Sequence, residues 1–137
     1  MFSKKIVYTA GTWDLLHIGH IRLLNRCKTF GDTLIVGVST DEVVKSHKYK
    51  NPFNSYDVRF EMVSSLRAVD LTVKQSLLLD IKFMLTLNID TLVLGDDWSS
   101  STLIGIEWAR REKHLIFLPR TEGISTSLIK QRLKDSQ

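Results

Sequence analysis

The sequence contains one cysteine, two prolines and no long uninterrupted apolar stretch. Because the single thiol, Cys27, has no cysteine partner within the chain, internal disulfides and multi-cysteine metal sites are excluded. No apolar run approaches the roughly 20 residues that cross a bilayer, so no membrane insertion is expected. Residues 1–5 are not followed by the apolar segment and cleavage site of a signal peptide. We therefore expect a protein of the reducing cytoplasm.

A strong charge imbalance is also missing. The 19 lysines and arginines outnumber the 15 aspartates and glutamates, for a net charge of +4. This excess suits phosphate-bearing ligands but is too small for a nucleic-acid-binding tail, so no nucleic-acid partner is expected. With 137 residues, 43% of them hydrophobic, the chain can bury one core but not two. We find no repeat, linker or low-complexity segment, and expect one domain over residues 1–137.

Short apolar segments alternate with helical patterns along the whole chain. Strands are predicted at 5–10, 33–40, 69–74, 91–95 and 114–119. Helices are predicted at 18–29, 56–67, 77–87 and 103–111, with a last one beginning at Ser125 or Thr126. The polar, basic stretch 45–54, which follows Asp41 and Glu42, is predicted to be a long functional loop. Five strands alternating with five helices indicate an α/β fold, with a parallel sheet wound on both faces and a site at the carboxyl ends of the strands.

The strongest local motif is His17-Ile18-Gly19-His20, at the point where the first strand gives way to the first helix. Positions i and i+3 share one face of a helix, so both imidazoles can point the same way. Gly19 lets a ligand approach the backbone, and a helix N-terminus attracts phosphate. The motif therefore predicts a phosphate-activating site. The alternative is two ordinary histidines, one capping the helix and one half-buried; a zinc site lacks further ligands.

A second polar motif spans residues 120–127, between the last strand and the last helix. Arg120 can clamp a triphosphate, Gly123 permits a tight turn, and the hydroxyls of 125–127 can bind phosphate. The alternative for these hydroxyls is a plain helix cap. Because the first and last strands of such a fold can open on the same edge, we expect this motif and the two histidines to face one cavity.

Taken together, these motifs closely resemble the bacterial glycerol-3-phosphate cytidylyltransferases. The resemblance covers nearly the whole chain and is carried by GTWDLLHIGHIRLL at 11–24, the Lys48 and Lys50 pair, SYDVR at 55–59, GDDW at 95–98 and RTEGISTS at 120–127. It implies a Rossmann-like fold, a homodimer, and in-line attack of an acceptor phosphate on the α-phosphorus of CTP with release of pyrophosphate. It also implies a Mg²⁺ ion that has no direct protein ligand.

The resemblance also implies roles for individual residues. Four are implied to be catalytic: His17, His20, Lys48 and Arg120. Those implied to bind the nucleotide come from the first turn, the GDDW segment and the last motif: Thr12, Trp13, Asp14, His17, Gly19, His20, Asp96, Arg120, Thr121, Gly123, Ile124, Ser125 and Thr126. Those implied to bind the acceptor are Lys48, Lys50, Arg59, Asp97 and Trp98.

The chain departs from the family pattern at 51–54 and at 99–105, both where an acceptor would be recognised. Glycerol 3-phosphate is the expected acceptor, and phosphocholine, phosphoethanolamine or a capsule-precursor phosphate are the alternatives. An adenylyltransferase on the same fold is a further alternative, because the histidine motif is shared by the wider nucleotidyltransferase superfamily. A non-catalytic domain that senses nucleotides or binds a partner is disfavoured by the presence of His17, His20 and Arg120 together.

Overall fold

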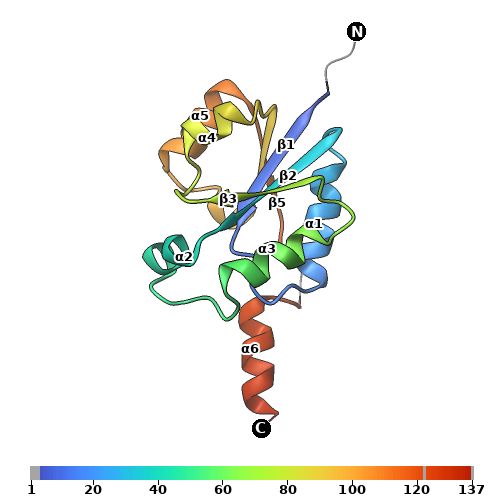
Figure 1. Cartoon of the computed structure of the whole chain (residues 1–137), viewed down its shortest axis with the longest axis vertical. Coiled ribbons are helices and arrows are strands. Elements are labelled where there is room, and N and C mark those ends of the chain that lie inside the picture. Colours follow the sequence, from blue (N-terminus) through green and yellow to red (C-terminus); the bar gives the residue numbers. More distant parts are fainter. Residues whose placement is uncertain (1–3, 122, 137) are drawn as a thin grey trace.

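A computed structural model describes residues 4–121 and 123–136, so Glu122 of the last motif lies outside the described residues. Within these ranges five parallel strands form one sheet in the order β3-β2-β1-β4-β5 (Figure 1). The strands are β1 Ile6–Gly11, β2 Thr33–Ser39, β3 Leu71–Gln75, β4 Thr91–Gly95 and β5 His114–Leu118. The helices are α1 Ile18–Lys28, α2 Asp41–Lys48, α3 Tyr56–Ser64, α4 Ile81–Thr86, α5 Ile104–Glu112 and α6 Thr126–Asp135, with a 3-10 turn, η1, at Asp96–Trp98.

The centre of the sheet is formed by β1, β2 and β4, which are covered on both faces. Most of their residues are buried, which explains why these strands are nearly continuous apolar runs rather than alternating patterns. The strand order reverses between β1 and β4, whose residues Val7 and Thr91 are paired. At such a reversal the neighbouring crossovers lead to opposite faces, which leaves a crevice at the carboxyl ends of the two strands.

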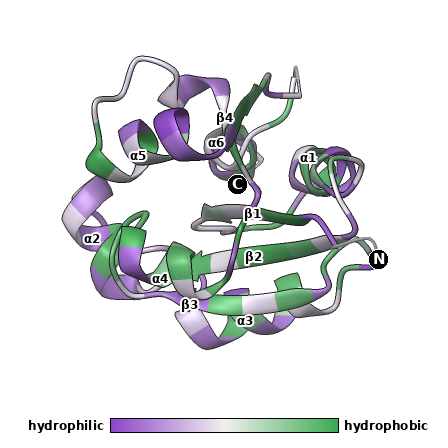
Figure 2. Ribbon diagram, turned by 90° about the horizontal axis from the view of Figure 1, so that it is seen from above, coloured by the Kyte–Doolittle hydropathy of each residue, from purple (hydrophilic) through white to green (hydrophobic). Residues whose placement is uncertain are grey.

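Two apolar clusters, one on each face, hold the helices to the sheet. Val7 packs with Leu24 of α1 and Val63 of α3, whereas the neighbouring Tyr8 packs with Met84 of α4 and Ile106 of α5. Successive strand residues point to opposite faces, so this division follows directly from the chain. Figure 2 shows the hydrophobic strands β1 and β2 inside the molecule, with helices around them. The predicted parallel α/β fold with helices on both faces is confirmed.

The structure corrects the prediction between β2 and α3. The helix α2 occupies part of the predicted loop, and only the residues after Lys48 form a loop. Thr40 starts α2 by accepting the Val43 N–H at 3.2 Å, and Val44 packs into the core. The predicted helix 77–87 is also shorter, because Leu79 has a left-handed backbone and the helix begins only after Asp80.

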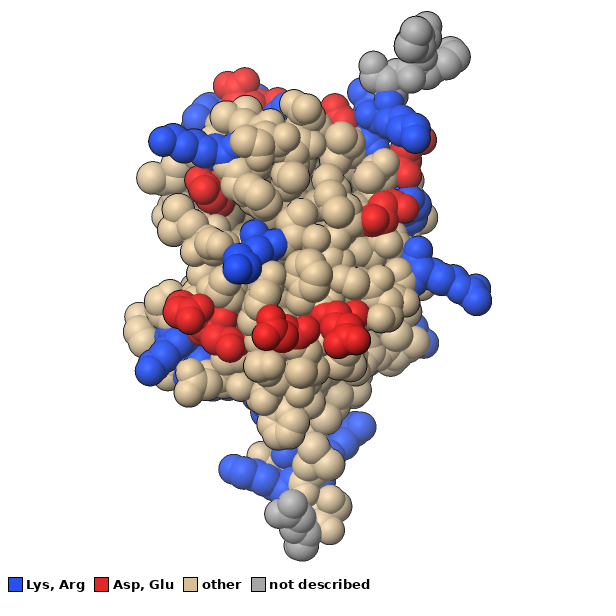
Figure 3. Space-filling view, in the orientation of Figure 1, with Lys and Arg blue, Asp and Glu red and all other residues tan. Residues whose placement is uncertain are grey.

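The last helix, α6, extends away from the body of the molecule at the lower end of Figure 1, and Figure 3 shows Lys and Arg side chains, in blue, on this projecting end. It has no fully buried residue, and its first residue, Thr126, is hydrogen-bonded to the body of the molecule at Asp14. Within residues 4–121 and 123–136, none of the helices combines the length and the apolar character needed to cross a bilayer.

Candidate active site

The histidine motif forms the start of α1. His17 is the N-cap, and its Nδ1 accepts the Gly19 N–H at 3.0 Å. The His20 Nδ1 in turn accepts the His17 N–H at 3.2 Å, and the two ring centroids are 3.9 Å apart. Because an Nδ1 that accepts a hydrogen bond carries no proton, both neutral rings hold their proton on Nε2. The capping interpretation and the phosphate interpretation are therefore compatible, since capping leaves two Nε2–H donors free to bind a ligand.

Both imidazoles are neutral at pH 7. Burial, together with the nearby charges of His17 and Lys48 and opposed by Asp14, lowers the pKa of His20 to about 4. Burial also lowers the pKa of His17 below its usual value. A Cβ at Gly19 would lie only 2.7 Å from the His17 ring, so the glycine is required for this cap. The motif thus supplies two directed hydrogen-bond donors without adding positive charge.

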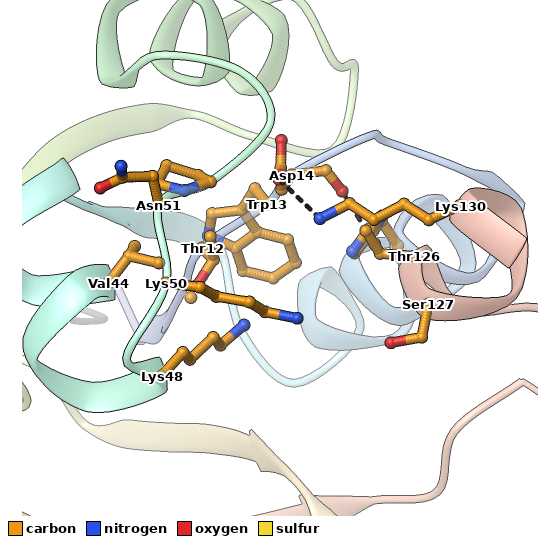
Figure 4. Close-up of a pocket in the computed structure, with 13 residues that line it drawn as sticks. Thr12, Trp13, Asp14, Val44, Lys48, Lys50, Asn51, Thr126, Ser127 and Lys130 are labelled. Carbon is orange, nitrogen blue, oxygen red and sulfur yellow. Dashed lines mark hydrogen bonds and ion pairs between the residues drawn. The ribbon is translucent and has the colours of Figure 1, made fainter. Parts of the chain in front are cut away.

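Three adjoining cavities open at the carboxyl ends of the strands. The lysine cavity, of about 540 Å³, is lined by Lys48, Lys50 and Lys130 (Figure 4). The helix cavity, of about 500 Å³, lies between α1 and the turn before α6 and is lined by His17 among others. The small cavity, of about 200 Å³, is bordered by Trp98. Among the described residues, Lys48 alone lines all three cavities, so they meet at its side chain.

Arg120 and Asp97 follow β5 and β4, and they line the border between the helix cavity and the small cavity. The Arg120 Nη2 lies 3.0 Å from the Asp97 Oδ2. The Arg120 side chain is 68% exposed, so solvent screens this ion pair, which contributes little to stability. Arg120 is therefore held at the rim of the site and can exchange its carboxylate partner for phosphate oxygens.

The start of α6 is fixed by its own hydroxyls. Ser125 caps the helix by accepting the Leu128 N–H at 3.1 Å, and Thr126 donates its hydroxyl to the Asp14 carbonyl at 2.9 Å. Gly123 has a φ of +77°, a left-handed conformation that favours glycine. The helix cap predicted as the alternative is present, and the same turn places Ser125 and Thr126 in the wall of the helix cavity.

Comparison with known proteins is consistent with this geometry. A family model described as cytidylyltransferase-like matches residues 8–132. The chain belongs to the cytidylyltransferase-like family. It is 40% identical over 131 residues to a glycerol-3-phosphate cytidylyltransferase of Bacillus subtilis, covering 95% of this chain and 97% of the relative. A glycerol-3-phosphate cytidylyltransferase of Staphylococcus aureus is 40% identical over 136 residues, covering 94% of this chain and 95% of the relative.

A solved structure has the same fold. The lipopolysaccharide core biosynthesis protein of Thermoplasma volcanium aligns with a TM-score of 0.76 at 22% identity, covering 88% of this chain and all of that protein. The family resemblance inferred from the motifs is confirmed, and this cytidylyltransferase-like chain is a nucleotidyltransferase. The roles of its individual residues are predictions that the geometry of the site makes specific.

The residues predicted to bind the nucleotide are distributed unequally around the site. Thr12, Trp13, Asp14, Gly19, Thr121 and Ile124 each line at least one of the three cavities. Trp13 is buried beneath the lysine cavity, and its indole N–H donates to the Gly37 carbonyl at 2.9 Å. Asp96 lines none of the three, whereas Asp97 lines two. Asp97 is therefore the carboxylate of this family motif that is placed to meet a ligand.

Arg59, predicted to bind the acceptor, is fully buried and lines none of the cavities. Its guanidinium donates to the carbonyls of Thr12 at 2.7 Å, Ser39 at 2.8 Å and Asn54 at 3.0 Å, and it pairs with Asp41 at 2.6 Å. These four bonds leave its side chain without access to a substrate. The acceptor-binding prediction for Arg59 is corrected, and its place is beneath the site, where it joins three loops.

Asp14 holds the lysine-bearing loop in place. Its carboxylate accepts the N–H of Phe53 at 2.6 Å and of Asn54 at 2.9 Å. The other end of the loop is the left-handed Tyr49 that ends α2. The segment that departs from the family pattern is therefore anchored at both ends, and Lys50 lies between the anchors. Burial and neighbouring lysines lower the pKa of Lys48.

Several wall residues were missed by sequence reasoning, and Lys130 is one that carries a charge. Lys130 lies in the second turn of α6 and lines the lysine cavity beside Thr126. The i,i+4 spacing of these two residues was the available signal, because it places them on one helical face. Across the described ranges, no cluster of three or more His, Cys, Asp or Glu side chains is placed to hold a metal ion.

Proposed function

We propose that this chain transfers CMP from CTP to glycerol 3-phosphate, giving CDP-glycerol and pyrophosphate. The observation that carries the proposal is the meeting of three cavities at Lys48, beside two imidazole donors and Arg120. In this reaction the CMP group, the acceptor and the leaving pyrophosphate surround one phosphorus atom, and three adjoining cavities around one cationic side chain suit that arrangement. The names of the two relatives at 40% identity support glycerol 3-phosphate as the acceptor.

The three cavities suit the three reacting parts. The helix cavity is the place for the nucleoside and the α-phosphate, because it lies over the start of α1 and contains Asp97, which can accept from the cytosine amino group. The small cavity has the polar side chains of Thr12, Ser39 and His47 in its wall, which suits the hydroxyl-bearing glycerol end of the acceptor. His47 stacks on Trp98 with ring centroids 5.2 Å apart, and both rings line that cavity. The lysine cavity receives the pyrophosphate.

In the proposed mechanism, an acceptor phosphate oxygen attacks the α-phosphorus while the bond to the bridging oxygen of pyrophosphate breaks. The attacking oxygen is already deprotonated at pH 7, so no general base is required. The Nε2–H groups of His17 and His20 donate to the non-bridging α-phosphate oxygens, and Lys48 neutralises charge between acceptor and leaving group. Stabilisation of this kind, by groups held in place before the reaction, is what phosphoryl-type transfer needs most.

Magnesium is part of the proposal as an ion carried by the triphosphate. The carboxylates of the site are engaged, since Asp14 accepts two backbone N–H groups and Asp97 pairs with Arg120. Among the residues that the structure describes, the donor groups do not form a metal site of their own, so the phosphate oxygens of CTP would hold the ion. Chelation by EDTA is expected to abolish turnover, and excess Mg²⁺ to restore it.

A homodimer is also proposed, on the family resemblance. The edge strand β3 and the loop after it expose apolar side chains, with Leu71 49% and Leu77 63% accessible, and such a surface is suited to association. Sedimentation equilibrium at micromolar concentration would measure the mass, and a purely monomeric result would contradict this part of the proposal.

The decisive experiment follows pyrophosphate release with Mg²⁺ and CTP across glycerol 3-phosphate, phosphocholine, phosphoethanolamine and several polyol phosphates. ATP is run in parallel, because adenylyl transfer on the same fold is the second candidate. Release with CTP and glycerol 3-phosphate is expected, and its absence would refute the acceptor assignment.

His17→Ala and His20→Ala are each expected to lower kcat by about 10²- to 10³-fold, the effect of losing one preorganised donor. Wild-type turnover in both variants would contradict the mechanism.

A further inference from the structure

Three lysines from three different elements line the same cavity. Lys48 is the last residue of α2, Lys50 lies in the loop that follows, and Lys130 comes from α6. Figure 4 shows their ammonium groups directed toward one common space. A cavity that gathers three cations, with the carboxylate of Asp14 as its only acidic lining residue among those described, is suited to a ligand with several negative charges.

The present partner of Lys130 holds it only weakly. Its Nζ lies 3.8 Å from the Asp14 Oδ2, beyond ordinary hydrogen-bond distance. The two Asp14 oxygens already accept the N–H groups of Phe53 and Asn54 at 2.6 and 2.9 Å. The Lys130 side chain is 36% exposed, so its ammonium group is accessible to a ligand entering the cavity.

The direction of Lys130 is set by the helix that carries it. Thr126, one turn earlier on the same face of α6, is tied to the Asp14 carbonyl at 2.9 Å. Ser125 caps the helix at this end. These two bonds fix the first turn, and the spacing of four residues then places Lys130 over the same cavity.

We infer that Lys130 is a third pyrophosphate-binding residue, acting with Lys48 and Lys50 on the β- and γ-phosphates of the nucleotide. This inference rests on the proposed function. When the bond to the α-phosphorus breaks, its electron pair stays on the β-phosphate oxygen, and the ammonium of Lys130 leaves Asp14 to neutralise that charge. Asp14 thus serves as the resting counter-ion and keeps Lys130 beside the path of the leaving group.

Titration calorimetry with inorganic pyrophosphate and Mg²⁺ tests the assignment without requiring turnover. Lys130→Gln should weaken pyrophosphate binding by about 10- to 100-fold, the usual effect of losing one charged hydrogen bond. Lys130→Arg should restore most of the affinity. Lys134→Gln is the matched control, since it removes the same charge from the same helix at a position that lines none of the three cavities.

Thermal denaturation without ligand separates binding from structure. Equal melting temperatures with weaker pyrophosphate binding in Lys130→Gln alone would support the inference. Equal weakening in Lys130→Gln and Lys134→Gln would overturn it, because only net charge would then matter. Wild-type affinity in Lys130→Gln, or no pyrophosphate binding by the wild-type chain, would overturn it as well. If pyrophosphate binds as expected but no acceptor reacts, the proposed acceptor fails while the inference holds.

Discussion

Replacing Arg59 by methionine should destabilise the protein without a direct effect on substrate contacts. The guanidinium is fully buried and serves three backbone carbonyls and the Asp41 carboxylate. Methionine fills a similar space but donates no hydrogen bond. The Asp41 side chain is 42% exposed, so water can solvate its carboxylate once the arginine is gone. The loss of stability therefore comes mainly from the carbonyls of Thr12, Ser39 and Asn54. At roughly 1 kcal/mol for each unsatisfied carbonyl, the loss is about 3 kcal/mol.

Urea denaturation at pH 7 measures this loss in the free energy of unfolding. Arg67→Met is the control, because Arg67 is an exposed arginine that follows the same helix, and exposed substitutions usually change stability by less than about 0.5 kcal/mol. A loss below about 1 kcal/mol for Arg59→Met would refute the reasoning. Full stability with a raised KM for the acceptor alone would return Arg59 to the substrate-binding role predicted from the sequence.

Three further outcomes are expected. Because the pKa of His20 is lowered to about 4, the unfolded chain takes up its proton first as pH falls below 6.5. Between pH 7 and 4.5 the free energy of unfolding should therefore drop by roughly 2 kcal/mol more in the wild type than in His20→Gln. Urea denaturation at the two pH values measures this difference, and an equal drop in both proteins would contradict the lowered pKa. Gly105→Ala should lower the melting temperature although alanine favours helices, since its Cβ would overlap the Leu79 backbone; a raised melting temperature would exclude this contact. Arg120→Ala should raise the KM for CTP and lower kcat. The free energy of unfolding in urea should stay within about 0.5 kcal/mol of the wild type, because the Arg120–Asp97 pair is exposed. Unchanged kinetics would show that Arg120 does not bind the triphosphate.

The fold could be predicted because its signals are local. Continuous apolar runs such as 33–39 are typical of strands covered on both faces, and their alternation with helices leaves few possible topologies. The helix α2 was missed because its sequence, DEVVKSHK, has only two adjacent apolar residues and therefore no clear periodicity. Thr40 before Asp41 and Glu42 was the available capping signal.

The sequence could predict those site residues whose side-chain directions are set by their spacing along one helix, as for His17 and His20. Arg59 was misassigned because a charged residue in a motif is usually solvent-exposed, and its neighbours in the sequence do not indicate that the distant carbonyls of Thr12 and Ser39 surround it. Lys130 was missed because its surroundings also depend on contacts between residues that are far apart in the sequence. Its contribution depends on where α6 attaches to the body, which is decided by the bond between Thr126 and Asp14, 112 residues apart in sequence.

Because α6 is only sparsely buried, this helix can open locally, and the site is complete only while the helix is folded against the body. This helix contributes Thr126 and Lys130 to the cavity wall, yet it buries no residue fully. Opening it would expose little apolar surface, so amide hydrogens in its last turns should exchange with solvent water through local unfolding, well below the free energy of global unfolding. A bound triphosphate would add contacts to this helix and so stabilise its folded form. Nucleotide occupancy would then be measurable as slowed amide exchange in α6.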